Sequence, residues 1–269
     1  MHFNFAFNTI QVLWAITFAA LLTLLVVLLG RDRAHRFPWF TASISMVTLS
    51  LLVNRLLYGR LAQIPMAVVS IVLSDLTAIL ALLVLVEMAR RVFGKASRRA
   101  WMAGTLGLLI AGGIVLGTWG VWPHLKSLKP FTLFTGLGML QLLAQKLGLL
   151  TDVMSIGLAL LVVLLGRRFG AGWRSHAQRI VIGLATASIS QLAWEAIWQI
   201  VAEHTHPHSM DEYQHVLGLK EKLFNGNKTI YAVVIVWWIV CLWINEPENV
   251  EPASTAPALE EAPAETPQP

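Results

Sequence analysis

Long apolar segments without charge are the feature that most constrains how this chain folds. Residues 10–30 form one such segment, which ends at the basic run 31–36. A helix rises about 1.5 Å per residue, so roughly 20 apolar residues cross the hydrocarbon core of a bilayer. A helix also satisfies its own backbone hydrogen bonds in lipid. The sequence lacks the alternating pattern of barrel strands, and it therefore predicts an all-α, polytopic integral membrane protein.

Composition agrees with a lipid environment and helps to divide the chain. It is 56% hydrophobic and 13% charged, whereas soluble domains are about 25% charged. We predict about seven transmembrane helices within residues 1–246, at 10–30, 38–58, 65–88, 101–122, 147–167, 180–202 and 229–245. We expect an interfacial helix at 131–145. Residues 247–269 are rich in Pro, Ala and Glu without any Lys or Arg, which predicts a disordered acidic cytoplasmic tail.

The distribution of basic residues predicts the orientation. Twelve of the 20 Lys and Arg residues fall in three short connections, at 31–36, 90–99 and 167–179. The other eight are spread over the longer opposite connections. By the positive-inside rule, the three basic connections are cytoplasmic. We thus expect a multi-pass protein of the cell (inner) membrane, with the N-terminus outside and the C-terminus in the cytoplasm.

Two short sequence segments occur twice in the same order. LLVVLLGR stands at 24–31 and 160–167, and TASIS follows each copy, at 41–45 and 186–190. The first two expected spans thus resemble the fifth and sixth. This order fits a parallel internal repeat of three helices, one linking helix and three more, as in some transporters. Chance similarity between Leu- and Val-rich segments is the alternative.

Polar residues inside the expected spans are the candidates for a functional site. An ionisable group within a span costs about 2.5–3.5 kcal/mol on insertion scales. Asp75 lies near the middle of the third span and Glu195 lies within the sixth. The pattern predicts a ligand, ion or proton site between these two spans, formed by Asp75, Ser74, Gln191, Glu195, Gln199 and Arg55. The alternative is a hydrogen-bonded or ion-paired network that only fixes helix packing.

Histidines after the sixth span are the candidate metal ligands. His204, His206 and His208 precede Asp211 and Glu212 in an expected outer loop. Alternate residues point to one side of an extended segment, so the three imidazoles could bind zinc or copper. We favour a solvated loop, because no second cluster of ligands is present elsewhere.

Two further features concern packing and partners. Gly113 and Gly117 have the GxxxG spacing that lets helices approach closely. This spacing suits packing within the chain or a homodimer. Glu87 lies four residues before Arg91, which predicts a surface ion pair. The net charge of +5 reflects the topology signals, so the expected partners are the lipid bilayer and a protein, with no nucleic acid.

Several common chemistries have no signature in this chain. There is no glycine-rich phosphate loop, HExxH or GxSxG. The last span has no lysine after Lys228, which excludes a retinal Schiff base, and no histidine lies within an expected span to bind haem. We therefore expect no cofactor and no enzyme activity. A non-catalytic sensing or accessory module is favoured, and a small-solute or ion transporter around Asp75 and Glu195 is the alternative.

Overall fold

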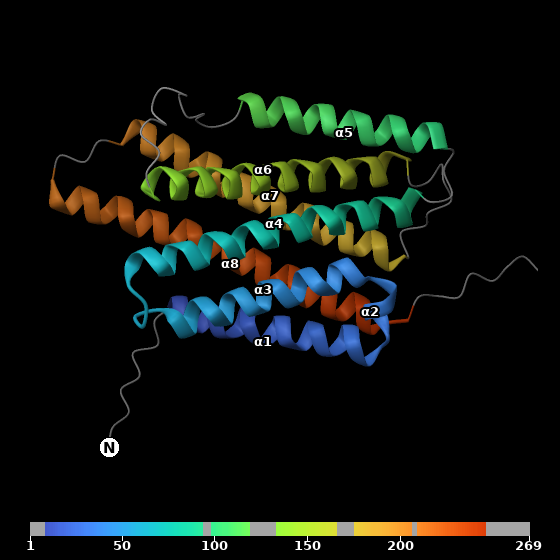
Figure 1. Ribbon diagram of the computed structural model, residues 1–269, viewed down its shortest axis with the longest axis horizontal. Helices are drawn as coiled ribbons and strands as arrows, with labels where there is room; N and C mark the ends of the chain where they lie inside the picture. The colour runs from blue at the N-terminus through green and yellow to red at the C-terminus, as the bar shows by residue number, and fades with distance from the viewer. Residues whose placement is uncertain (1–8, 94–97, 119–132, 166–174, 206–208, 246–269) are drawn as a thin grey trace, which may run out of the picture.

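The fold is an array of long, roughly antiparallel α-helices (Figure 1). A computed structural model describes residues 9–93, 98–118, 133–165, 175–205 and 209–245. All regular secondary structure in these ranges is helical, so the predicted all-α class is confirmed. The expected tail at 247–269 lies outside the described residues.

Within the described residues, each expected span overlaps a helix. The helices are α1 Thr9–Gly30, α2 Arg33–Arg36, α3 Pro38–Leu57, α4 Gln63–Phe93, α5 Arg98–Thr118, α6 Leu133–Leu165, α7 His176–His204 and α8 Met210–Trp243. Within the described residues, six helices are long and apolar enough to cross a membrane, namely α1, α3, α4, α6, α7 and α8. In α5 the apolar stretch Leu109–Thr118 is shorter. The chain is thus a multi-pass membrane protein, but the count of seven spans is not confirmed.

Helix α6 differs from the expected pair of an interfacial helix and a separate span. It is continuous from Leu133 to Leu165, so the break predicted near Lys146 was wrong. Lys146 is 9% exposed, and its ammonium donates to the carbonyl of Leu116 at 3.4 Å. Leu116 lies in the last turn of α5, where carbonyl groups lack helical partners and favour a cation. This contact explains how a lysine lies within an apolar helix.

Helix α8 also begins earlier than the apolar pattern indicated. Ser209 caps it by accepting a hydrogen bond from the Glu212 backbone N–H at 3.2 Å. Asp211 and Glu212 occupy the first turn, where negative charge is favourable. Residues 210–228, which we expected in a loop, are therefore helical.

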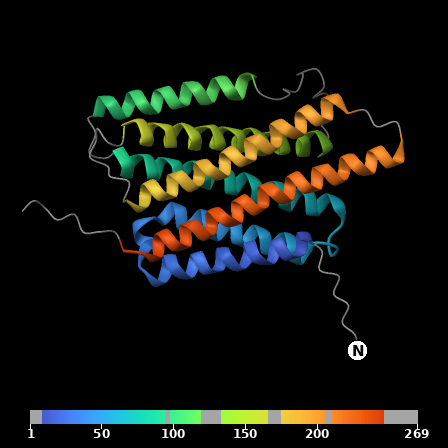
Figure 2. The ribbon, with the colours of Figure 1, turned by 180° about the vertical axis from the view of Figure 1, so that it is seen from behind.

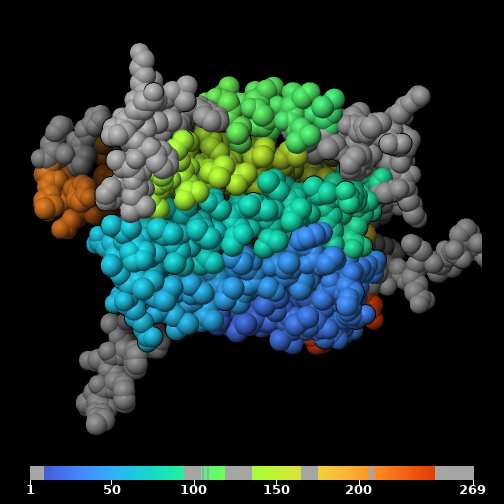
Figure 3. Space-filling view, in the orientation of Figure 1, coloured from blue at the N-terminus to red at the C-terminus, as the bar shows by residue number. Residues whose placement is uncertain are grey.

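The helices form two broad faces. Figures 1 and 2 show α3 and α4 on one side and α7 and α8 on the other. In the space-filling view, side chains of α3 and α4 meet across one face and α5 forms the edge beyond α6 (Figure 3). Helices α1, α4, α6 and α8 all end at the same end of the array (Figure 1). We call this the basic end, because it carries Arg31, Arg33, Arg36, Arg90 and Arg91.

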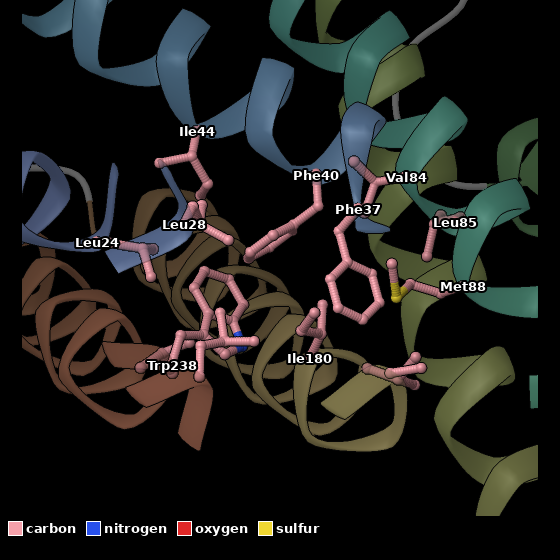
Figure 4. Packing of buried hydrophobic residues seen from close by; sticks show 14 of the residues in the cluster. Leu24, Leu28, Phe37, Phe40, Ile44, Val84, Leu85, Met88, Ile180 and Trp238 are labelled. Carbon is pink, nitrogen blue, oxygen red and sulfur yellow. The ribbon is translucent and has the colours of Figure 1, made fainter. Parts of the chain in front are cut away.

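The tightest packing lies near the basic end. The Trp238 side chain is 2% exposed and meets the Phe40 ring edge-on, with centroids 5.2 Å apart (Figure 4). The indole also contacts Gly183 of α7 so closely that a Cβ there would overlap it. The surrounding buried side chains come from several helices and include Leu24, Leu28, Phe37, Ile44, Val84, Met88, Ile180 and Ile235.

A buried carboxylate joins α4 to the start of α3. Glu87 accepts a hydrogen bond from the Phe40 backbone N–H at 3.2 Å and one from Arg91 at 3.3 Å. The predicted i,i+4 pair with Arg91 is confirmed, but the expectation of a surface pair was wrong, since the Glu87 side chain is 6% exposed. Phe40 lies in the first turn of α3, so Glu87 satisfies a backbone donor that lacks a helical partner.

The repeated segments pack differently in the two places. Leu24, Val27 and Leu28 are buried, whereas their counterparts Leu160, Val163 and Leu164 are exposed. In the second pair of segments, Ile44 is buried and its counterpart Ile189 is 54% exposed. Identical sequences therefore have different packing environments, and the repeat is not confirmed.

Gly183→Ala should destabilise the fold, because its new methyl group would overlap the Trp238 indole. Overpacking of this kind costs about 1–3 kcal/mol. Thermal unfolding of the detergent-solubilised protein measures the loss. Gly148→Ala in α6 is the control, since a Cβ there has no neighbour within 4 Å. Equal melting temperatures for the two variants would contradict the packing account.

Glu87→Ala should also lower stability, because it leaves the Phe40 N–H and Arg91 without this acceptor. A buried donor left unsatisfied costs about 1–3 kcal/mol. Glu87→Gln retains a carbonyl oxygen that can accept from Phe40, so we expect a smaller loss. Unfolding titrations in a denaturing detergent compare the two variants, and an equal loss in both would argue against the backbone contact.

Candidate ligand cavity

A cavity of about 560 Å³ lies between α1, α3, α6, α7 and α8. Its apolar and aromatic lining consists of Ile10, Leu13, Trp14, Val47, Leu51, Ala187, Phe224 and Tyr231. Its polar lining consists of Thr17, Asp152, Gln191, Asn225, Asn227 and Lys228. This volume is in the range of sites for small organic molecules, and a mostly apolar wall with a few polar groups is typical of them.

Helical periodicity explains why these residues share the cavity. In α1, Ile10, Leu13, Trp14 and Thr17 recur at spacings of three and four residues and so lie on one face. In α8, residues 224, 227, 228 and 231 follow the same spacing. Two helices thus each contribute a stripe, and α3, α6 and α7 supply the remaining wall.

Two opposite charges line the cavity without forming an ion pair. Asp152 is half-buried and interacts with Ser188 and Glu195 of α7. The Lys228 ammonium lies 5.3 Å from the centre of the Phe224 ring. Within the described part of the chain, no salt bridge joins Asp152 to Lys228. Both charges are therefore available to a molecule that enters the cavity.

A chain of hydrogen bonds fixes the wall between α7 and α8. The Asn227 amide donates to Gln191 at 2.7 Å and its carbonyl accepts from the Ser190 hydroxyl at 2.7 Å. Gln191 in turn donates to Glu195 at 2.7 Å. The amide groups of Gln191 and Asn227 are thereby held in defined orientations.

Asn225 adds an acceptor without a partner to the same wall. Its side-chain oxygen is buried and has no hydrogen-bond partner in the structure. A buried polar atom without a partner costs free energy, and a donor on a bound molecule would remove that cost.

The structure brings three of the six predicted site residues to this region. Gln191 lines the cavity, and Glu195, which is exposed, hydrogen-bonds Gln191. The Arg55 guanidinium lies 5.6 Å from the ring centre of Trp14, a lining residue. The sixth expected span, in α7, therefore contributes Gln191 to the cavity wall, and the facing groups come from α1, α6 and α8.

The other three predicted residues do not line this cavity. Ser74 is exposed, and one carboxyl oxygen of Asp75 is buried without a hydrogen-bond partner. Gln199 donates to Glu203 at 3.0 Å on the exposed face of α7. A role for Asp75 beside Glu195 remains a prediction.

Sequence reasoning missed Asn225, Asn227 and Lys228 because residues 203–228 were expected to be a loop. The signal was the spacing of Phe224, Lys228 and Tyr231, which is helical. Asp152 falls within the expected span at 147–167 but was not among the predicted site residues.

Of the predicted metal ligands, His204 lies at the end of the bundle away from the basic residues. His204 ends α7, and its Nδ1 lies 2.9 Å from the Ile200 carbonyl oxygen. His206 and His208 lie outside the described residues. Asp211 and Glu212 are part of α8 and no longer belong to a loop. No group of three or more His, Cys, Asp or Glu residues suited to a metal occurs among the described residues.

The predicted GxxxG pair does not mediate the main contact of α5. A Cβ on Gly104 would lie 3.7 Å from Leu161, and one on Gly112 would lie 2.8 Å from Leu150 of α6. A Cβ on Gly113 or Gly117 would have no neighbour within 4 Å. Packing of α5 on α6 thus uses other glycines, and a homodimer through Gly113 and Gly117 stays a prediction.

The cavity and the tight packing occupy different halves of the bundle. In α1, the residues that line the cavity lie at 10, 13, 14 and 17, and those buried in the core lie at 21, 24, 27 and 28. In α8, residues 224–231 line the cavity and residues 234–242 contribute to the core.

Comparison of the chain with protein-family models, curated proteins and solved structures found no match. Any function must therefore be argued from this geometry.

The Gln191–Asn227 hydrogen bond should stabilise the α7–α8 contact measurably. A double-mutant cycle with Gln191→Ala, Asn227→Ala and the double variant isolates the pair. Side-chain hydrogen bonds within membranes contribute about 0.6 kcal/mol on average and about 1.7 kcal/mol at most, and we expect a coupling in this range. Unfolding in a denaturing detergent gives the values, and zero coupling would mean that the bond does not hold these helices together.

Proposed function

We propose that this protein is a non-catalytic membrane receptor that binds a small amphipathic molecule in the cavity. The observation that carries the proposal is the placement of the cavity, which contains polar and charged groups, beside a closed core. The molecule would enter from the end away from the basic residues, which the charge distribution predicts to be outside. Binding would then act on the core and on the basic end.

Helix α8 supports this proposal because it links the two regions. Phe224 and Tyr231 line the cavity, while Trp238 lies in the core one to two turns further along. Beyond the core, Trp243 lies under the Arg31 guanidinium, 4.7 Å from the ring centre. Asn245 accepts hydrogen bonds from Arg31 and Arg33 at 3.4 Å. A shift or rotation of α8 on binding would thus change contacts at the basic end.

The closed core argues against transport through the bundle. Leu21, Leu28, Ile180 and Ile235 are each fully buried between the cavity and the basic end. A transporter needs a second state in which this half opens, and the packing around Trp238 would have to separate. Asp152 and Glu195, two interacting acids beside the cavity, are the observation that favours an ion-coupled transporter as the second candidate.

In the described wall of the cavity, one hydroxyl is hydrogen-bonded within its own helix. Thr17 is a hydroxyl-bearing residue in the wall, and its hydroxyl donates to the Leu13 carbonyl at 2.8 Å. Nucleophilic catalysis needs a neighbouring base that accepts the hydroxyl proton. These contacts support binding as the function.

Ala187→Trp should abolish ligand binding by filling the cavity. In a thermal-shift screen of small amphipathic molecules, a ligand should raise the melting temperature of the purified wild-type protein. The same molecule should leave the melting temperature of this variant unchanged. Ile189→Trp is the matched control, since Ile189 is on the same helix, 54% exposed and outside the cavity wall. It should respond as wild type does.

Leu51→Phe provides a second test if Ala187→Trp does not fold. Leu51 lines the cavity from α3, so the larger side chain should weaken binding from the opposite wall. A molecule that stabilises wild type and both cavity variants equally would bind elsewhere and overturn the proposal.

A further inference from the structure

We propose that the molecule bound in this cavity is an amphipathic zwitterion, held by an ammonium group at Asp152 and an anionic group at Lys228. The inference rests on the proposed function, because it names the chemical class that the same cavity accepts. It follows from the two separate charges, the acceptor on Asn225 and the apolar wall.

The separate charges argue most strongly for a zwitterion. Asp152 comes from α6 and Lys228 from α8, and no salt bridge joins them within the described residues. A singly charged ligand would pair with one of these groups and leave the other without an opposite charge. A ligand with both charges satisfies both groups.

The Asn225 amide offers a further acceptor to an ammonium in the cavity. An ammonium has three N–H donors. A single carboxylate rarely accepts hydrogen bonds from all three. The Asn225 side-chain oxygen is buried without a partner and lines the same cavity. It is therefore an acceptor for a donor that the protein itself does not supply.

The remaining wall suits an apolar body. Trp14, Leu51 and Phe224 line the cavity from three different helices. Phe224 and Trp14 are fixed by ring contacts, with Trp194 at 6.2 Å and with Phe18 at 5.2 Å between centroids. The volume of about 560 Å³ exceeds that of two charged groups alone, so the ligand carries a sizeable hydrophobic part.

Two sources provide this chemistry. One is a free apolar amino acid or dipeptide, and the other is a lipid with an ethanolamine headgroup. At about 1.5 Å per residue, Asp152 lies roughly 20 Å from the basic end of α6. A hydrocarbon core of about 30 Å places the cavity in the opposite half of the membrane, within reach of both sources.

The experiment measures binding of matched probes to the full chain in nanodiscs of phosphatidylglycerol, a lipid that carries no ammonium group. The free probes are L-phenylalanine and the dipeptide Leu-Leu. Their counterparts lack one charge or both: 2-phenylethylamine, 3-phenylpropanoate and 3-phenylpropanamide for phenylalanine, and N-acetylated or amidated Leu-Leu. The lipid probe is phosphatidylethanolamine, compared with its N-acetylated form. We expect a zwitterion to bind about ten- to a hundredfold more tightly than its singly charged counterparts, since a charged hydrogen bond contributes that much.

Variants assign the two charges. Asp152→Asn should weaken zwitterion binding about tenfold or more and reduce the preference over the analogue without an ammonium. Lys228→Gln should also weaken zwitterion binding about tenfold or more, and it should reduce the preference over the analogue without an anionic group. Asp211→Asn and Lys222→Gln are the charge-matched controls, because both side chains are exposed and lie outside the cavity, and both should bind as wild type does.

The outcomes separate this inference from the proposed function. One outcome is that Ala187→Trp abolishes binding but neither zwitterion binds more tightly than its counterparts. This outcome would overturn the inference of a zwitterionic ligand and leave the proposed receptor function standing. Binding of the zwitterion that survives Ala187→Trp would overturn both. If phosphatidylethanolamine binds tightly and the free probes do not, the lipid is the source. If the free probes bind tightly and phosphatidylethanolamine does not, the free solute is the source. Failure of every zwitterion to bind would overturn the inference.

Discussion

The contact of Trp238 with Gly183 is the interaction on which the rest of the arrangement depends. It lets α7 and α8 approach closely near the basic end, and Phe40 of α3 packs against the same indole. Glu87 joins α4 to this packing by accepting a hydrogen bond from the Phe40 backbone N–H. Close approach at one end explains why the core is closed there. Further along α7, side chains such as Ala187 and Gln191 leave a space between α7, α8, α1 and α6.

Polar groups within the bundle serve two different purposes. Glu87 and Lys146 are paired with backbone groups at the ends of neighbouring helices, which satisfies atoms that would otherwise lack partners in lipid. Asp152, Asn225 and Lys228 line a cavity instead, and the Asn225 oxygen has no partner. The first set stabilises helix ends, and the second set supports our proposal of a binding site. Burial alone does not distinguish the two sets. They differ in whether their polar atoms contact backbone groups of a neighbouring helix or face the cavity.

Much of the helical architecture could be predicted from the chain, and the errors have identifiable physical causes. Apolar runs located all of the long helices, since lipid requires internal backbone hydrogen bonding. The breaks expected near Lys146 and before Lys228 were wrong because charged residues were taken as marks of a connection. A lysine can remain in a helix when a carbonyl or a cavity accepts its ammonium. The two LLVVLLGR segments are identical in sequence, yet Leu24 and Leu28 are buried whereas their counterparts Leu160 and Leu164 are exposed.

The sequence by itself determined the class of protein, the approximate helices and the gathering of basic residues at one end, because these follow from local hydrophobicity and charge. It also identified Gln191 and Glu195 as part of one polar stripe, since helical spacing places them together. Tertiary structure alone decided which groups face that stripe. Asp152 and Lys228 are 76 positions apart in the chain, and only the packing of α6, α7 and α8 places both on one cavity. Distances across helices depend on side-chain packing, which no local pattern encodes.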